Sequence, residues 1–295
     1  SPAASALPFR VGCSTRTSVH LHLLEIMRRT HVLADCGSNA VLVPFEHGDE
    51  LARALGDGAL EAAFLCDVPT VLNLRARPNL RLMATPGPLG KVRLLVASSS
   101  KTTCLDDLRG KWVAVKQWSL CHRFLLEWLR DAPKGVGVCD LAEPPADALA
   151  SGRADAVVVH DPEAAALIVG GQARAIREET YLSQLAVTTE ALEGRPADVV
   201  AFARGLRGSL AYLGAHRDEV SRWAASTSGF PASALDLAAR ANPHYLEAHE
   251  AHSLDVSLRP RDIETLERCV QYALKAHLMR ETVDIRSRVV AIPRP

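Results

Sequence analysis

The chain has 295 residues, of which 48% are hydrophobic and 23% charged, an ordinary globular composition in a chain long enough for two lobes. Lys plus Arg and Asp plus Glu both number 34, so the zero net charge gives no reason to expect a nucleic acid or an anionic membrane as a partner. No apolar run approaches the roughly 20 residues that span a bilayer, so we expect no membrane insertion.

The first ninety residues alternate short apolar runs with amphipathic stretches, which is typical of βαβ units. Helical spacing lies between the apolar runs, one helix ends at Gly56, and another opens at Asp67. Strands are predicted over residues 9–13, 41–44, 60–65 and 80–83.

A crossing strand over 92–97 precedes a second set of alternating elements. Strands over 112–115, 136–138 and 156–159 alternate with helices that begin near Ser119, Pro145 and Glu163. A strand over 185–187 returns the chain to the first lobe, and the sequence from Pro196 onward is helical.

We therefore predict an α/β protein with two mixed sheets and a helical C-terminal segment. Residues 1–93 and 185–295 form one lobe, residues 94–184 form the other, and a ligand cleft lies between them.

Seven cysteines, an odd number without close pairing, are typical of a reducing compartment, so we expect a cytoplasmic protein. The chain starts Ser-Pro-Ala without a Met or an apolar signal core. Removal of a signal would leave the alternative of a periplasmic protein, or of an extracellular lipid-anchored one.

Ligands of open α/β sheets bind beyond the carboxyl ends of the strands, where this chain concentrates cysteine and histidine. Ser119 is a plausible helix cap whose free backbone N–H groups could hold an anion, and only one of Cys121 and His122 can face the cleft. The candidate substrate contacts are Ser14, Thr15, Cys66, Asp67, Trp118, Ser119, Cys121, His122, His160 and Asp161.

Cys13 is the candidate nucleophile, because it ends a strand where the next helix starts and a helix N-terminus favours thiolate. Arg16 and His47 are the cationic neighbours that the sequence offers. The alternative is that Cys13 is a small residue on the pocket floor. A zinc or copper site built from Cys13, Cys66, Cys121 and His160 is conceivable, but we expect neither a metal nor another cofactor.

Several motifs are similar to those of the nitrate/sulfonate/taurine group of solute-binding proteins. They are the strand 7–13, the strand and turn over 58–69, the segment Cys104 to Val115 that would enter the second lobe, and the segment 157–171 containing His160-Asp161-Pro162. The resemblance covers nearly the whole chain and implies a two-lobed fold of the periplasmic-binding-protein type (type II).

Within that group the chain resembles an enzyme branch, the 2′-hydroxybiphenyl-2-sulfinate desulfinases. Cys13 falls where that branch carries its nucleophilic cysteine, and His47 corresponds to its active-site histidine. The resemblance implies a desulfinase-like hydrolase or lyase that cleaves a carbon–sulfur or related bond of a small substrate.

The alternative is a binding protein that hands a small sulfonate, a nitrate-like anion or a thiamine-precursor-like heterocycle to an ABC permease. A third possibility, a pyrimidine synthase of the thiamine-precursor branch, is weaker because its cysteine-rich motif is missing.

Overall fold

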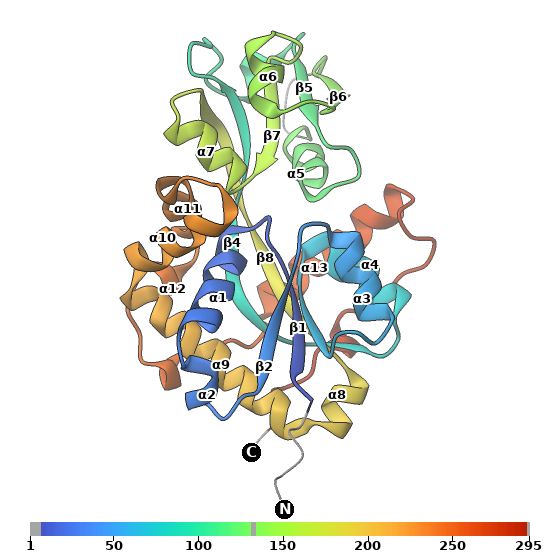
Figure 1. The fold of residues 1–295 in the computed structure, drawn as a ribbon. Coiled ribbons are helices and arrows are strands. Elements are labelled where there is room, and N and C mark those ends of the chain that lie inside the picture. Colours follow the sequence, from blue (N-terminus) through green and yellow to red (C-terminus); the bar gives the residue numbers. More distant parts are fainter. Residues whose placement is uncertain (1–6, 131–133, 294–295) are drawn as a thin grey trace, which may run out of the picture.

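Two long antiparallel strands, β4 (Leu80–Ala97) and β8 (Ala173–Thr188), run from one lobe of the molecule into the other (Figure 1). The computed structural model describes residues 7–130 and 134–293. The two-lobed α/β fold predicted from the sequence is confirmed.

The lower lobe in Figure 1 is built on three short parallel strands beside β8, in the order β2-β1-β3. β1 and β3 are buried along most of their length, as expected for strands covered by helices on both faces. The elements are β1 (Phe9–Ser14), α1 (Ser18–Arg29), α2 (Val32–Asp35), β2 (Ala40–Phe45), α3 (Gly48–Gly56), β3 (Ala62–Cys66) and α4 (Asp67–Ala76).

The upper lobe repeats this design on a smaller scale beside β4, with the strand order β7-β5-β6. Its elements are η1 (Leu105–Leu108), β5 (Trp112–Val115), α5 (Leu120–Trp128), β6 (Gly137–Asp140), α6 (Pro145–Ala150), β7 (Ala156–His160) and α7 (Glu163–Val169).

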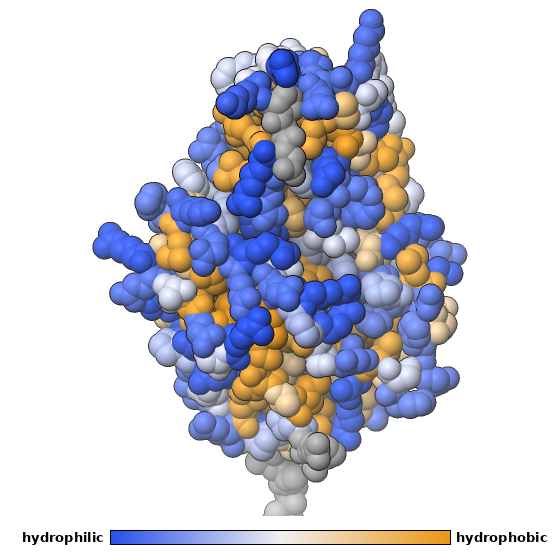
Figure 2. Space-filling model, turned by 180° about the vertical axis from the view of Figure 1, so that it is seen from behind, coloured by the Kyte–Doolittle hydropathy of each residue, from blue (hydrophilic) through white to orange (hydrophobic). Residues whose placement is uncertain are grey.

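The predicted helical C-terminal segment returns to the lower lobe after β8, and its last long helix packs against α4. It comprises α8 (Thr189–Gly194), α9 (Pro196–Ala215), α10 (Arg217–Ser228), α11 (Ala232–Ala239), α12 (Pro243–Leu246), η2 (Ala251–Ser253), α13 (Pro260–Lys275) and η3 (Arg286–Arg288). From the opposite side, hydrophilic side chains cover the junction of the lobes (Figure 2).

The prediction of two separate sheets was wrong, since β4 and β8 join all the strands into one ladder, β2-β1-β3-β8-β4-β7-β5-β6. The strands predicted over 80–83 and 92–97 both belong to β4, which continues through Pro86-Gly87-Pro88 with register shifts. The Asn242 side chain donates hydrogen bonds to the carbonyls of Pro86 and Pro88, at 2.8 and 2.9 Å. These bonds satisfy backbone groups that the irregular ladder leaves unpaired.

The predicted lobe boundaries, after residues 93 and 184, fall within β4 and β8 and remain a proposal. One buried core cluster includes Val11 and Phe64 of the lower lobe together with Val113 and Leu125 of the upper lobe. The lobes therefore share apolar packing beside the crossing strands.

Candidate functional site

A cavity of about 600 Å³ lies between the lobes, and we call it the interlobe cavity. Its lower wall comes from the end of β1, the start of α3 and the β3–α4 junction. Its upper wall comes from residues 116–121, the end of β7 and the start of α7. The carboxyl ends of β1, β3 and β7 thus meet there, as the sequence argument required.

The N-terminus of α1 borders the interlobe cavity at Thr17. The Thr17 side chain is buried, and its Oγ1 does not cap the helix and has no hydrogen-bond partner in the described parts of the chain. Next to it, the exposed Arg16 guanidinium makes no hydrogen bond or ion pair with any described residue. An unpaired cation, a free hydroxyl and the positive end of a helix dipole together favour a bound anion.

The N-terminus of α5 faces the same cavity from the upper lobe. Ser119 caps the helix, since its Oγ accepts a hydrogen bond from the His122 backbone N–H at 3.3 Å. Lys116 lies on the same wall, and its ammonium is 3.9 Å from the Asp140 carboxylate at the surface. Two helix N-termini from opposite lobes therefore point to one space.

Apolar side chains form much of the remaining wall of the interlobe cavity. They come from both lobes and include Phe64, Leu65, Val68, Leu72, Leu120, Leu141, Val158 and Val159. Such a wall suits the hydrocarbon part of a small organic molecule.

Groups of both signs stand at the edge of the cavity. His160 lines it, and its Nδ1 lies 2.8 Å from the Asp161 carbonyl oxygen, so Nε2 remains for a ligand. The carboxylates of Glu46, Asp49 and Glu163 also line it. The wall of the interlobe cavity therefore carries both positive and negative groups and is not uniformly positive.

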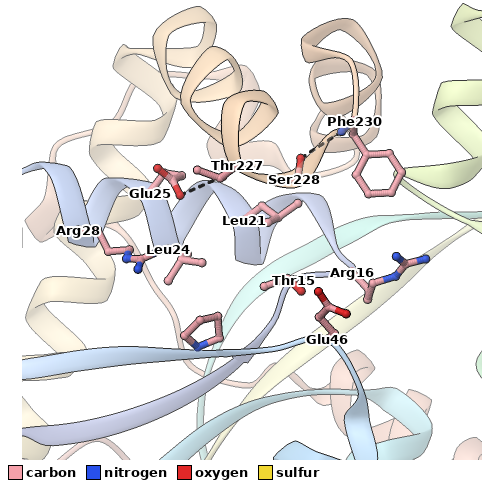
Figure 3. Close-up of a pocket in the computed structure, with 11 residues that line it drawn as sticks. Thr15, Arg16, Leu21, Leu24, Glu25, Arg28, Glu46, Thr227, Ser228 and Phe230 are labelled. Atoms are coloured by element: carbon pink, nitrogen blue, oxygen red, sulfur yellow. Dashed lines mark hydrogen bonds between the residues drawn. The ribbon is translucent and has the colours of Figure 1, made fainter.

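A smaller cavity of about 360 Å³ adjoins the interlobe cavity and shares Arg16 and Glu46 with it (Figure 3). Thr15 and Arg28 line only this smaller cavity, and the Thr15 hydroxyl donates to the Phe45 carbonyl at 3.3 Å. Its Glu25 side chain is engaged by Arg29 and by the Thr227 hydroxyl. Thr15 thus does not reach the interlobe cavity, in contrast to the prediction.

Cys13 is not a nucleophile in this structure, and that prediction was wrong. The side chain is fully buried in the apolar core and does not line the cavity. Burial raises the pKa of the Cys13 thiol to about 12, and the charge of Arg28 lowers it only in part. Ser14, one position later in the strand, faces the cavity instead.

Cys66 and Cys121 do line the interlobe cavity, as predicted, on its lower and upper walls. Burial raises the pKa of each thiol to about 12, so both remain protonated near neutral pH. His47 also lines the cavity, exposed at the start of α3. No described group of three His, Cys, Asp or Glu side chains could hold a metal ion.

Three other candidates turn away from the interlobe cavity, because residues distant in the sequence engage them. Asp67 is buried and accepts hydrogen bonds from the Leu182 N–H and the Gln184 amide. Asp161 is buried in an ion pair with Arg93. His122 faces α13, with Nδ1 3.1 Å from the Tyr272 hydroxyl.

Sequence reasoning missed several residues that line the interlobe cavity, including Thr17, Lys116, Glu163 and Tyr181. Lys116 and Glu163 each follow a predicted strand within a few residues, so the strand-end argument could have included them. Tyr181 lies within a long strand, and no local sequence signal marks it.

Comparison with known proteins identifies the fold. A "Putative aliphatic sulfonates-binding protein" of Escherichia coli K12 is 27% identical over 261 residues, which cover 84% of this chain and 78% of that protein. The periplasmic aliphatic sulphonate-binding protein SsuA of Escherichia coli superimposes with a TM-score of 0.80 at 21% identity, covering 99% of this chain and 94% of that one. The chain has the two-lobed fold of the sulfonate-binding proteins. No family model matches the sequence.

The alkanesulfonate-binding protein SsuA of Xanthomonas axonopodis pv. citri, solved with bound MOPS, has a TM-score of 0.73 at 21% identity and covers 98% of this chain and 100% of that one. A variant of the desulfurization enzyme DSZB in complex with biphenyl-2-sulfinic acid has a TM-score of 0.72 at 18% identity, covering 96% and 97%. At that identity the likeness to the enzyme concerns the fold alone.

The prediction of a desulfinase-like enzyme is therefore corrected. The relative detected by sequence is a sulfonate-binding protein, and Cys13 is a buried, protonated core residue. The cytoplasmic location predicted with it has no support from these comparisons. Among the described residues, no helix is long and apolar enough to cross a membrane.

Proposed function

We propose that this protein is the substrate-binding component of an ABC transporter and that it holds a small organic sulfonate in the interlobe cavity. One observation carries the proposal: the N-termini of α1 and α5, from opposite lobes, meet at a cavity where Arg16 has no partner among the described residues. A sulfonate offers three acceptor oxygens with one negative charge, which backbone N–H groups, Thr17 Oγ1 and a guanidinium can share.

The apolar wall supports an organic sulfonate over an inorganic ion. Leu65, Val68 and Val159 lie on the wall of a cavity whose volume is about 600 Å³, far larger than a nitrate-sized ion. An uncharged heterocycle would make no charge-assisted hydrogen bond with the unpaired Arg16 guanidinium or the two helix N-termini. A hydrocarbon chain or ring attached to the sulfonate gains free energy by leaving water for this wall.

The partner in this proposal is a membrane permease, and the location is the periplasm. Two similar structures support this part of the proposal: one is named a periplasmic aliphatic sulphonate-binding protein, and the other a periplasmic protein of a putative sulfonate ABC transporter. Of the seven cysteines, Cys13, Cys121 and Cys269 are buried, and none forms a disulfide in the part of the chain that the structure describes. Burial protects these three thiols, so they are compatible with an oxidising compartment.

Isothermal titration calorimetry with 1-hexanesulfonate tests the proposal. We expect saturable binding with one ligand per chain, no binding of 1-hexanol, and weaker binding of ethanesulfonate, which lacks most of the hydrocarbon. No sulfite should be released on prolonged incubation. Absence of saturable binding by every alkanesulfonate from two to eight carbons would overturn the proposal.

A further inference from the structure

A third cavity, of about 480 Å³, lies between α5 of the upper lobe and α13 of the C-terminal segment, and we call it the α5/α13 cavity. Its wall shares only Trp118 with the interlobe cavity. Behind Trp118, the ring of His122 contacts the Trp118 ring edge-on and bonds to the Tyr272 hydroxyl. His122 and Tyr272 line the α5/α13 cavity and not the interlobe cavity.

The α5/α13 cavity is strongly positive in a chain of zero net charge. Among the described residues, Arg123, Arg130, Arg268 and Lys275 line it together with one carboxylate, Glu127, which leaves three positive charges in excess. Burial lowers the pKa of His122, so this side chain adds no charge near neutral pH.

These cations are available to a ligand. Within the part of the chain that the structure describes, Arg268 donates only to the neutral Thr265 hydroxyl, at 3.0 Å. Arg130 and Lys275 are exposed, and neither makes an ion pair within residues 7–130 and 134–293. Mutual repulsion between such groups favours an anion among them.

The unused hydrogen-bond donors of the buried Arg123 are independent evidence that this cavity can bind an anion. Its side chain is 2% exposed, and Nη1 donates to Glu127 at 2.9 Å. Nε and Nη2 have no hydrogen-bond partner among the described residues, and the guanidinium lies over the Phe124 ring at 3.9 Å. A buried cation with unused donors is costly, and a nearby anion offsets that cost.

The same cavity has an apolar side. Trp118 and Leu126 are exposed there, at 53% and 41%. Trp118 also adopts a φ of 61°, a backbone conformation that bulky side chains rarely take. The fold therefore holds an aromatic ring at the border of a cationic cavity, where it can pack against the apolar part of a ligand.

We propose that the α5/α13 cavity is a second binding site, for a small organic anion that carries an aromatic or other apolar group. The acid group would lie between Arg268 and Lys275, within the field of Arg123, and the apolar group would cover Trp118 and Leu126. Apart from Trp118, the site shares no lining residue with the interlobe cavity, and it does not depend on the function proposed for that cavity.

Calorimetric titration with phenyl phosphate tests this proposal in an Arg16→Ala background, which weakens anion binding in the interlobe cavity. We expect one saturable site that binds inorganic phosphate several-fold more weakly than phenyl phosphate. The double change Arg268→Ala with Lys275→Ala should weaken phenyl phosphate binding at least tenfold.

The matched control is Lys101→Ala with Arg280→Ala, which removes the same charge from exposed positions that line neither cavity. It should leave binding within twofold. Absence of a saturable site, or equal weakening by both double changes, would overturn the proposal. Equal affinity for inorganic phosphate would overturn the apolar part of the site.

Discussion

The Arg93 guanidinium holds the Asp161 carboxylate through two buried contacts, Nε to Oδ1 at 3.0 Å and Nη2 to Oδ2 at 3.1 Å, where β4 meets the end of β7. The Lys91 backbone N–H also donates to Asp161, at 2.9 Å. Gly90 permits this close approach, because a Cβ at that position would lie 2.8 Å from the Asp161 Cβ. Asp161 therefore joins β4 to β7 and is not available to a ligand.

Asp161→Asn should destabilise the protein by about 3 kcal/mol, because it leaves part of a buried guanidinium unpaired. Arg93 keeps Glu178 as a partner, so the loss should be smaller than for complete isolation of the charge. Urea unfolding followed by circular dichroism measures the change. A loss below about 0.5 kcal/mol would show that the pair contributes little.

Cys13 should behave as a core residue. Cys13→Ser should cost about 1–3 kcal/mol because it places an unpaired hydroxyl among apolar side chains, and Cys13→Ala should cost less than Cys13→Ser. In the folded protein, iodoacetamide should modify the exposed Cys104 long before Cys13. Mass spectrometry of tryptic peptides measures the order, and early labelling of Cys13 would contradict its buried position.

Stability should decline in mild acid partly because of His22. Burial lowers the pKa of His22 to about 4, below its ordinary value of 6.5. The unfolded chain therefore binds the proton more readily, and stability is lost as the pH falls from about 6.5 to about 4. The contribution of this one group reaches about 3 kcal/mol.

His22→Gln should make the free energy of unfolding less dependent on pH over that interval, by up to one proton per chain. His31→Gln, at an exposed position, is the control and should leave the dependence unchanged. Urea unfolding at several pH values provides the measurement. Identical slopes in the two variants would show that His22 is not the responsible group.

His160 lines the interlobe cavity and His122 does not, so substitutions of these two histidines serve as a test and its control. His160→Gln should weaken 1-hexanesulfonate binding several-fold, because His160 lines the cavity with Nε2 unused. His122→Gln should change the affinity less than threefold, because His122 faces α13. Calorimetry measures the affinity of both variants. A larger loss of affinity in His122→Gln than in His160→Gln would contradict binding of the sulfonate in the interlobe cavity.

The sequence predicted the two-lobed fold because each short strand and its following helix carry local periodicity. It also predicted that the carboxyl ends of the strands line the cavity, and Cys66, Ser119 and His160 do so. The continuity of β4 could not be predicted, since the bonds that accommodate Pro86 and Pro88 come from Asn242, more than 150 residues away.

The errors at the site have similar causes. Asp161 and His122 turn away because Arg93 and Tyr272, far along the chain, bind them. The position predicted to face the cavity at the end of β1 was wrong by one residue. Successive side chains of a strand point to opposite faces, so Cys13 faces the core and Ser14 faces the cavity. Local sequence patterns predict where a strand ends but not which partner its last side chains meet.

The most direct test of the sulfonate-binding proposal is the affinity of 1-hexanesulfonate for the protein and for two arginine variants. Arg16 lines the interlobe cavity, whereas Arg28, also exposed, lines only the adjoining smaller one. Calorimetry should show that Arg16→Ala weakens binding by about 10- to 100-fold, the effect of losing a charge-assisted hydrogen bond, and that Arg28→Ala changes it less than threefold. Equal affinities for the protein and for Arg16→Ala would contradict the account.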